Sequence, residues 1–113
     1  MANTGQRAAI YIRCARDEQF AAQEQRKECK EYIEKMGYTF AGEYIDMGAS
    51  GLTNTRSALD AITIDAHIGE LDRIIILSMA RLSRSAKDAQ QFCNDLKESC
   101  GVVVEAVERS AMI

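Results

Sequence analysis

The stretch that most constrains the fold is RIIILSM, residues 73–79, because its centre is an unbroken run of isoleucine and leucine. A strand that is apolar on both faces must be covered on both faces, as happens in a parallel sheet whose strands are joined by helices. Residues 8–14 (AAIYIRC) and 102–107 (VVVEAV) are of the same kind. These runs predict a sheet buried between two layers.

Segments with helical periodicity separate these runs. Residues 18–36 carry a stripe at helical spacing and end at Gly37, a residue that commonly terminates helices. A second helix is predicted over residues 85–101 and closes at Gly101. The stripe of the first helix is predicted to consist of Phe20 or Ala21, Gln25, Cys29, Tyr32, Ile33 and Met36.

The remaining segments repeat this order. Residues 38–46 (YTFAGEYID) read as a strand, residues 47–55 as a turn-rich loop, and residues 56–70 as a helix that Thr55 could cap and Gly69 could end. Strands that alternate with helices predict a three-layer α/β domain: a mostly parallel sheet of about four to five strands, right-handed crossovers, and helices on both faces.

Length and composition indicate one ordinary globular domain. The chain has 113 residues, of which 47% are hydrophobic and 27% charged, and we expect residues 1–113 to form a single domain. It has neither an apolar run long enough to span a bilayer nor an N-terminal signal, so we expect a cytoplasmic protein without a membrane partner. The net charge of −3 means that any polyanion site must be built from local arginines.

The cysteines do not favour a metal site or a disulfide framework. The four cysteines occur singly, without a C-x-x-C pair, and the chain has one histidine. Small buried hydrophobic side chains are the better interpretation of Cys14, Cys29, Cys93 and Cys100.

Arginines gather at the predicted carboxyl ends of the strands, where open parallel sheets bind ligands. The planar guanidinium binds phosphate oxygens in bidentate fashion and stays charged, so five arginines at one edge favour a phosphate or phosphodiester site. For any one of these arginines alone, a solvated loop residue is the better interpretation. The predicted edge contains Arg13 and Arg16, then Asp46, Ser50 and Arg56, then Arg81, Ser83 and Arg84.

Other phosphate-binding folds lack their motifs here. The chain has neither G-x-x-x-x-G-K-[ST] nor G-x-G-x-x-G, so a nucleotide cofactor is not predicted. A phospho-acceptor domain would need acidic residues at the strand ends to hold Mg²⁺, but the first strand ends in Arg-Cys-Ala-Arg.

Three ordered motifs carry a resemblance to a known family. YIRCARDEQ, then YIDMGASG with TNTRSALD, then IIILSMARLSRS resemble the catalytic domain of the serine recombinases, the resolvase and invertase family, over almost the whole chain. The family pattern is Y-x-R-x-S, then D-x-x-x-S-G followed by an arginine, then D-R-x-x-R.

The resemblance implies a site for DNA strand cleavage and exchange through a phosphoserine intermediate, without a metal or other cofactor. Tyr11 and Arg13 would belong to the wall of the site, and Gln19 would be a nearby polar support. Asp46 and Ser50 would orient groups from the second loop. The scissile phosphate would be held by Arg56, Arg81 and Arg84.

Two positions depart from the family pattern. Ala15 stands where the nucleophilic serine should be, and Ala80 where the late aspartate should be. A methyl group cannot attack phosphorus, so the chain is expected to be inactive as it stands. Cys14 is adjacent, but neighbouring side chains on a strand point to opposite faces. A natural degenerate member and deliberate inactivation both fit these two alanines.

The resemblance also implies partners. DNA would be the substrate, and the full-length protein would act as a homodimer or tetramer with a C-terminal DNA-binding region that this chain does not contain. The alternative is a non-catalytic module that uses the same fold for DNA binding or subunit assembly. A phosphate-ester hydrolase is the least favoured interpretation, because the sequence places neither a base nor a nucleophile for it.

Overall fold

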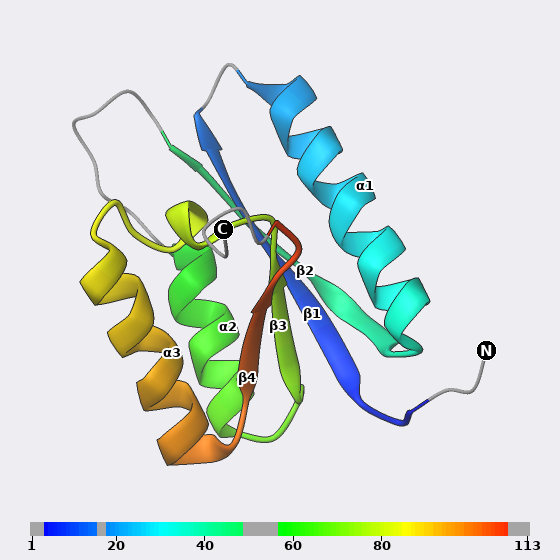
Figure 1. Ribbon diagram of the computed structural model, residues 1–113, viewed down its shortest axis with the longest axis vertical. Coiled ribbons are helices and arrows are strands. Elements are labelled where there is room, and N and C mark those ends of the chain that lie inside the picture. Colours follow the sequence, from blue (N-terminus) through cyan, green and yellow to red (C-terminus); the bar gives the residue numbers. More distant parts are fainter. Residues whose placement is uncertain (1–3, 16–17, 49–56, 109–113) are drawn as a thin grey trace.

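The computed structural model describes residues 4–15, 18–48 and 57–108 (Figure 1). Strands and helices alternate along these ranges, as the apolar runs and helical stripes predict. A short 3₁₀ helix, η1, lies between β3 and α3. The elements are β1 (Arg7–Ala15), α1 (Gln19–Met36), β2 (Thr39–Gly48), α2 (Ser57–His67), β3 (Arg73–Ile76), η1 (Met79–Arg81), α3 (Ala86–Cys100) and β4 (Val103–Ala106).

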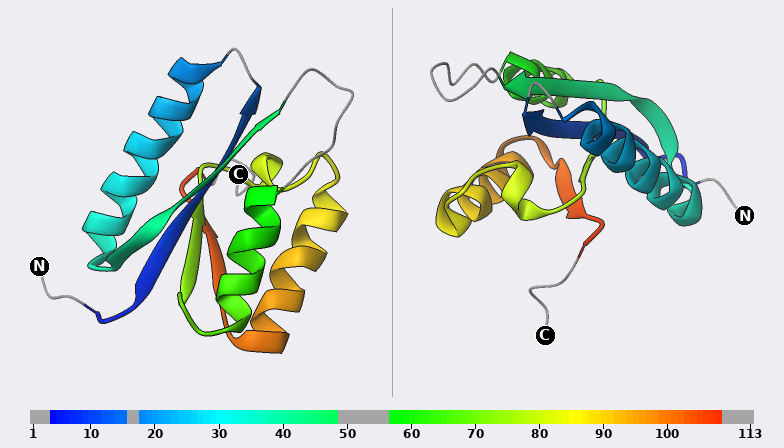
Figure 2. Two further views of the ribbon diagram at one scale, coloured as in Figure 1. Left: turned by 180° about the vertical axis from the view of Figure 1, so that it is seen from behind. Right: turned by 90° about the horizontal axis from the view of Figure 1, so that it is seen from above.

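The four strands form one parallel sheet in the order β2-β1-β3-β4. Helix α1 covers one face of the sheet, and α2 and α3 cover the other (Figures 1 and 2). The chain first moves from β1 to β2 and then crosses back to β3, so crossovers of one hand place the helices on opposite faces. The predicted three-layer α/β fold is confirmed, and its order reverses between β1 and β3.

Strand β1 divides the core into two clusters. Ala9 and Tyr11 pack on the side of α2 and α3, whereas Ala8, Ile10 and Ile12 pack on the side of α1. This alternation follows from the two-residue period of a strand. All of these side chains are fully buried, as expected for a central parallel strand.

The buried face of α1 differs from the predicted stripe at its start. Phe20 is 76% exposed, and the helix contacts the sheet through Ala22, Gln25, Cys29 and Ile33. Ala22, Cys29 and Ile33 keep helical spacing with one another, while Phe20 falls outside their face because it lies five residues before Gln25. Met36 is also exposed, at the last turn.

The helix ends agree with the turn chemistry of the sequence. Gly37 and Gly101 follow α1 and α3 with φ of 76° and 75°, the left-handed conformation that closes a helix. Ser85 begins α3 by accepting a hydrogen bond from the Asp88 backbone N–H at 3.2 Å. Thr55, the predicted cap of α2, lies outside the described residues. Within the described part of the chain, no helix is long and apolar enough to cross a membrane.

Candidate active site

The carboxyl ends of the strands meet at one edge of the sheet (Figure 1). Ala15 at the end of β1 lies opposite Gly48 at the end of β2. The pairing between β1 and β3 ends at Ile10 and Ile75, so β1 continues past β3, and η1 follows β3 on that side. The site is therefore expected where the strand order reverses, which is where open α/β sheets form a crevice.

Two side chains converge on the backbone carbonyl of Arg13 in this region. The Gln25 Nε2 group donates to it from α1, and the Arg81 Nη1 group donates to it from η1, each at 3.1 Å. Gln25 is only 1% exposed, and its Oε1 atom has no hydrogen-bond partner. The guanidinium of Arg81 is thus tied to the end of β1 by a bond to the main chain.

A second set of hydrogen bonds, centred on Asp46, joins β1, β2 and α2. The buried Tyr11 hydroxyl donates to Asp46 Oδ2 at 2.7 Å. Asp46 also accepts from the backbone N–H groups of Ala58 at 2.8 Å and Leu59 at 3.1 Å. Because these N–H groups lie in the first turn of α2, Asp46 caps that helix with its side chain.

The end of β1 holds Ala15 on the surface and Cys14 in the core. Ala15 is exposed. Cys14 packs in the cluster on the α1 side, with its sulfur 3.1 Å from that of Met47. Burial raises the pKa of the Cys14 thiol, the Glu18 carboxylate raises it further, and Arg81 opposes them. The thiol is therefore protonated at neutral pH, which makes it a weak nucleophile.

The other predicted site residues lie at or beyond the same edge. Gln19 is exposed at the first position of α1, Ala80 is exposed within η1, and Arg84 is exposed just after η1. Arg13 is half-buried. The structure thus gathers the first and third motifs around the end of β1. Ser50, Arg56 and Arg16 lie outside the described residues.

Two residues with contacts at this edge escaped the sequence analysis. Gln25 was assigned to the apolar stripe of α1, although a polar side chain within such a stripe is itself a signal of a buried hydrogen bond. Glu18 is not among the predicted site residues, but its carboxylate accepts a hydrogen bond from the Ala15 backbone N–H at 3.0 Å. Neither contact could be read from residue spacing alone.

The arrangement suits an anion more than a cation. The Arg81 side chain reaches the Arg13 carbonyl near the end of β1, and a guanidinium there can bind phosphate oxygens. Asp46 is only 6% exposed and already accepts three hydrogen bonds, so it has little capacity to hold a metal ion. Among the described residues, no group of three or more His, Cys, Asp and Glu side chains could form a metal site.

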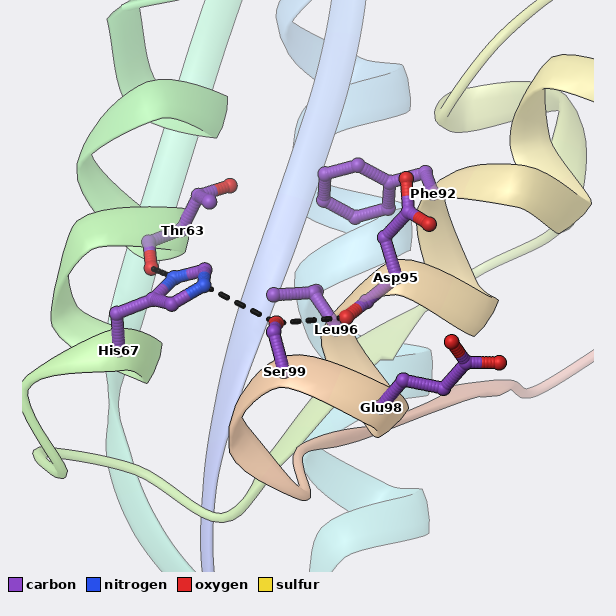
Figure 3. A pocket seen from close by; sticks show the side chains of 7 residues that line it. All are labelled: Thr63, His67, Phe92, Asp95, Leu96, Glu98 and Ser99. Atoms are coloured by element: carbon purple, nitrogen blue, oxygen red, sulfur yellow. Dashed lines mark hydrogen bonds between the residues drawn. The ribbon is translucent and has the colours of Figure 1, made fainter.

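A hollow between α2 and α3 lies away from this edge (Figure 3). His67 bridges the two helices there: its Nδ1 atom lies 2.9 Å from the Thr63 carbonyl oxygen, and its Nε2 atom lies 3.1 Å from Ser99 Oγ. Ser99 in turn donates to the Asp95 carbonyl oxygen at 2.6 Å. The lining, which includes Phe92, contains none of the predicted site residues. The network accounts for the contact between the helices without any ligand.

Comparisons with known proteins give a consistent family. The model described as "Resolvase, N terminal domain" matches residues 8–111. A search of curated protein sequences finds no match. Among solved structures, the N-terminal catalytic domain of TP901-1 integrase is 26% identical with a TM-score of 0.76, and the match covers 90% of this chain and 77% of that one.

Two further structures agree. The C-terminal catalytic domain of ISC1926 TnpA, an IS607-like serine recombinase, is 26% identical with a TM-score of 0.76, over 89% of this chain and 70% of that one. A resolvase family site-specific recombinase from Streptococcus pneumoniae has a TM-score of 0.78 at 21% identity, over 90% of this chain and 72% of that one, and supports the fold. The chain therefore belongs to the resolvase N-terminal domain family and is related to the catalytic domains of serine recombinases.

Proposed function

We propose that this chain is the catalytic-type domain of a site-specific DNA recombinase, one that binds a DNA phosphate but does not cleave the strand as it stands. The observation that carries the proposal is the pair formed by Arg81 and the end of β1. Arg81 donates to the Arg13 carbonyl, two residues before Ala15. A fixed cation therefore lies beside the position from which a nucleophile would attack.

Fixed positive charge is what a phosphodiester transition state requires, because its non-bridging oxygens gain negative charge. The Arg81 guanidinium is positioned by a main-chain bond, and Arg13 lies two residues before Ala15 on the same face of β1. Arg56 and Arg84 are proposed to complete the phosphate contacts, and Ser50 and Gln19 to support them. Asp46 and Tyr11 serve the site indirectly by holding α2 against the strand ends.

Cleavage also needs a nucleophile, and the chain has a methyl group at position 15. In the proposed reaction of a serine at this position, the hydroxyl loses its proton as its oxygen bonds to phosphorus, the bond from phosphorus to a deoxyribose oxygen breaks, and the leaving oxygen takes up a proton, so the number of protons is unchanged. Rejoining reverses these steps on a partner strand. Cys14 is a poor substitute because it faces the α1 cluster and because burial raises the pKa of its thiol.

The decisive experiment is to trap a covalent adduct on nicked suicide DNA duplexes of mixed sequence. The unchanged chain is compared with Ala15→Ser, Ala80→Asp and the double variant. Ala86→Ser, an exposed alanine at the start of α3, controls for the gain of a hydroxyl elsewhere. An adduct that requires Ala15→Ser and that maps to residue 15 supports the proposal.

Two results would count against it. An adduct formed by the unchanged chain would show that another side chain attacks. The second result concerns binding: Arg81→Ala should weaken binding of a short duplex and reduce the slope of log K against log salt by about 1, whereas Lys97→Ala, at the far end of α3, should not. Equal effects of the two changes would refute the phosphate site and favour a subunit-assembly role.

A further inference from the structure

Ala15, at the end of β1, and Glu18 are joined by a pair of reciprocal hydrogen bonds. The Ala15 backbone N–H donates to the Glu18 carboxylate at 3.0 Å, and the Glu18 backbone N–H donates to the Ala15 carbonyl oxygen at 3.0 Å. The Glu18 carbonyl oxygen then accepts from the Ala22 N–H at 3.1 Å, at the beginning of α1. The peptide of residue 15 is therefore fastened to the start of a helix through one side chain.

The spacing of this pair is that of a capping box. In such a box, a glutamate three residues after a serine or threonine returns its carboxylate to the backbone N–H of that residue, and the hydroxyl accepts from the N–H of the glutamate. Here the glutamate half is present, but position 15 holds alanine, and the Glu18 N–H bonds to the main chain instead. Glu18 is itself the N-cap of α1, so the pair lies one turn before the helix, and a hydroxyl at position 15 would stand at the separation from Glu18 at which a capping box joins two residues.

The charge of Glu18 also reaches the end of β1. At the neighbouring residue, Cys14, burial raises the pKa of the thiol most, the Glu18 carboxylate raises it further, and the Arg81 guanidinium lowers it. A nucleophile at the end of β1 is consequently influenced by a carboxylate and a guanidinium that act in opposite directions. The balance of these two charges decides how readily it ionises.

We propose that Glu18 is a positioning residue for position 15: its carboxylate holds the peptide of residue 15, and its charge tunes the ionisation of a nucleophile placed there. The inference rests on the proposed function, because it takes position 15 as the attacking position. Glu18 acts through residue 15 and the strand end, and it needs no contact with DNA.

The test uses a thiol as a probe and no DNA. Ala15→Cys is made together with Cys14→Ala, so that the proteolytic peptide contains one thiol, and the rate of its alkylation by iodoacetamide is followed against pH by mass spectrometry. Glu18→Gln removes the charge but keeps an acceptor oxygen, and Glu18→Ala removes both. Glu24→Gln, an exposed change on the same helix, is the matched control.

Glu18→Gln and Glu18→Ala should lower the pKa of the introduced thiol by roughly 0.5 unit, and Glu24→Gln should leave it in place. In the otherwise unchanged chain, Glu18→Ala should speed hydrogen exchange of the residue 15 amide about fivefold, whereas Glu18→Gln should not. Equal pKa values for the Glu18→Gln and Glu24→Gln proteins, or an amide that exchanges equally fast in all variants, would overturn the inference.

These readouts separate the inference from the proposed function. If the Ala15→Ser protein neither binds nor cleaves DNA, the proposed function is refuted. The pKa of the thiol at position 15 and the exchange rate of the residue 15 amide would still report on Glu18. Conversely, the Ala15→Ser protein could form a covalent DNA adduct while the pKa of a thiol at position 15 does not change with Glu18. That result would support the proposed function and refute the positioning role of Glu18.

Discussion

The contact between Tyr11 and Asp46 allows the most quantitative prediction. Asp46→Ala removes two hydrogen bonds to the first turn of α2 and the hydrogen bond that the buried Tyr11 hydroxyl donates to a carboxylate. The lost cap costs about 1 kcal/mol, and a lost hydrogen bond to a charged group costs about 1.5–3 kcal/mol. We therefore expect Asp46→Ala to lower the free energy of unfolding by about 2–4 kcal/mol.

Tyr11→Phe probes the same contact from the other side. In the unchanged chain it removes a hydrogen bond to a carboxylate and should cost about 1.5 kcal/mol, because Asp46 keeps its two backbone donors. In the Asp46→Ala background, the hydrogen bond to Asp46 is already gone. There the same change should cost less than it does in the unchanged chain.

Urea unfolding followed by circular dichroism gives all four free energies of this cycle. The expected coupling energy between the two positions is about 1–3 kcal/mol. The reasoning is refuted if the two single effects simply add, because Tyr11 and Asp46 would then not depend on each other. Ser85→Ala, which removes the cap of α3 at the same edge, is the matched control and should add to either change.

Two further predictions concern Gln25 and Asp72. Gln25→Met should change the free energy of unfolding by less than about 1 kcal/mol, because the lost bond to the Arg13 carbonyl is offset by removal of an unpartnered buried Oε1. The same change should weaken binding of a short DNA duplex. Unchanged binding would exclude a role for Gln25 at the site. Hydrogen bonds from the Arg7 side chain and backbone lower the pKa of Asp72. The stabilisation from this carboxylate is therefore present above its unfolded pKa of about 3.9 and is lost as pH falls through the lower folded value. The urea midpoints of the unchanged chain and Asp72→Asn should differ at pH 6 and converge towards pH 2, and a constant difference would contradict this reasoning.

The order of the elements was predictable because burial on both faces leaves a clear pattern. The run at residues 73–79 could only be a covered strand, and the alternation of such runs with helices fixed the layers. The rotation of α1 was not predictable at its start, since Phe20 and Ala22 are both apolar and only packing decides between them. The strand after residue 72 also proved shorter than its apolar run, because the chain turns at Ser78 into η1.

The candidate site was predictable in its residues more than in its contacts. Strand ends and the family resemblance singled out Arg13, Arg81, Tyr11 and Asp46, and hydrogen bonds join them in two pairs, while their roles in a reaction stay a prediction. The bonds of the Arg13 carbonyl could not be foreseen, because a backbone acceptor has no signature in the sequence. For the same reason, Gln25 was read as part of a packing stripe.

Some of the predicted site residues also stabilise the fold, which explains how this edge of the sheet can keep its structure without a nucleophile. Asp46 caps α2 and Tyr11 supports Asp46, so changing either of them disturbs the fold as well as the site. Ala15 and Ala80 are both exposed. An aspartate at position 80 would add little to stability, because surface substitutions away from special contacts usually change it by less than about 0.5 kcal/mol. At position 15, alanine already allows both main-chain contacts with Glu18. Catalytic groups at these positions can therefore be absent while the proposed phosphate-binding framework around them stays folded.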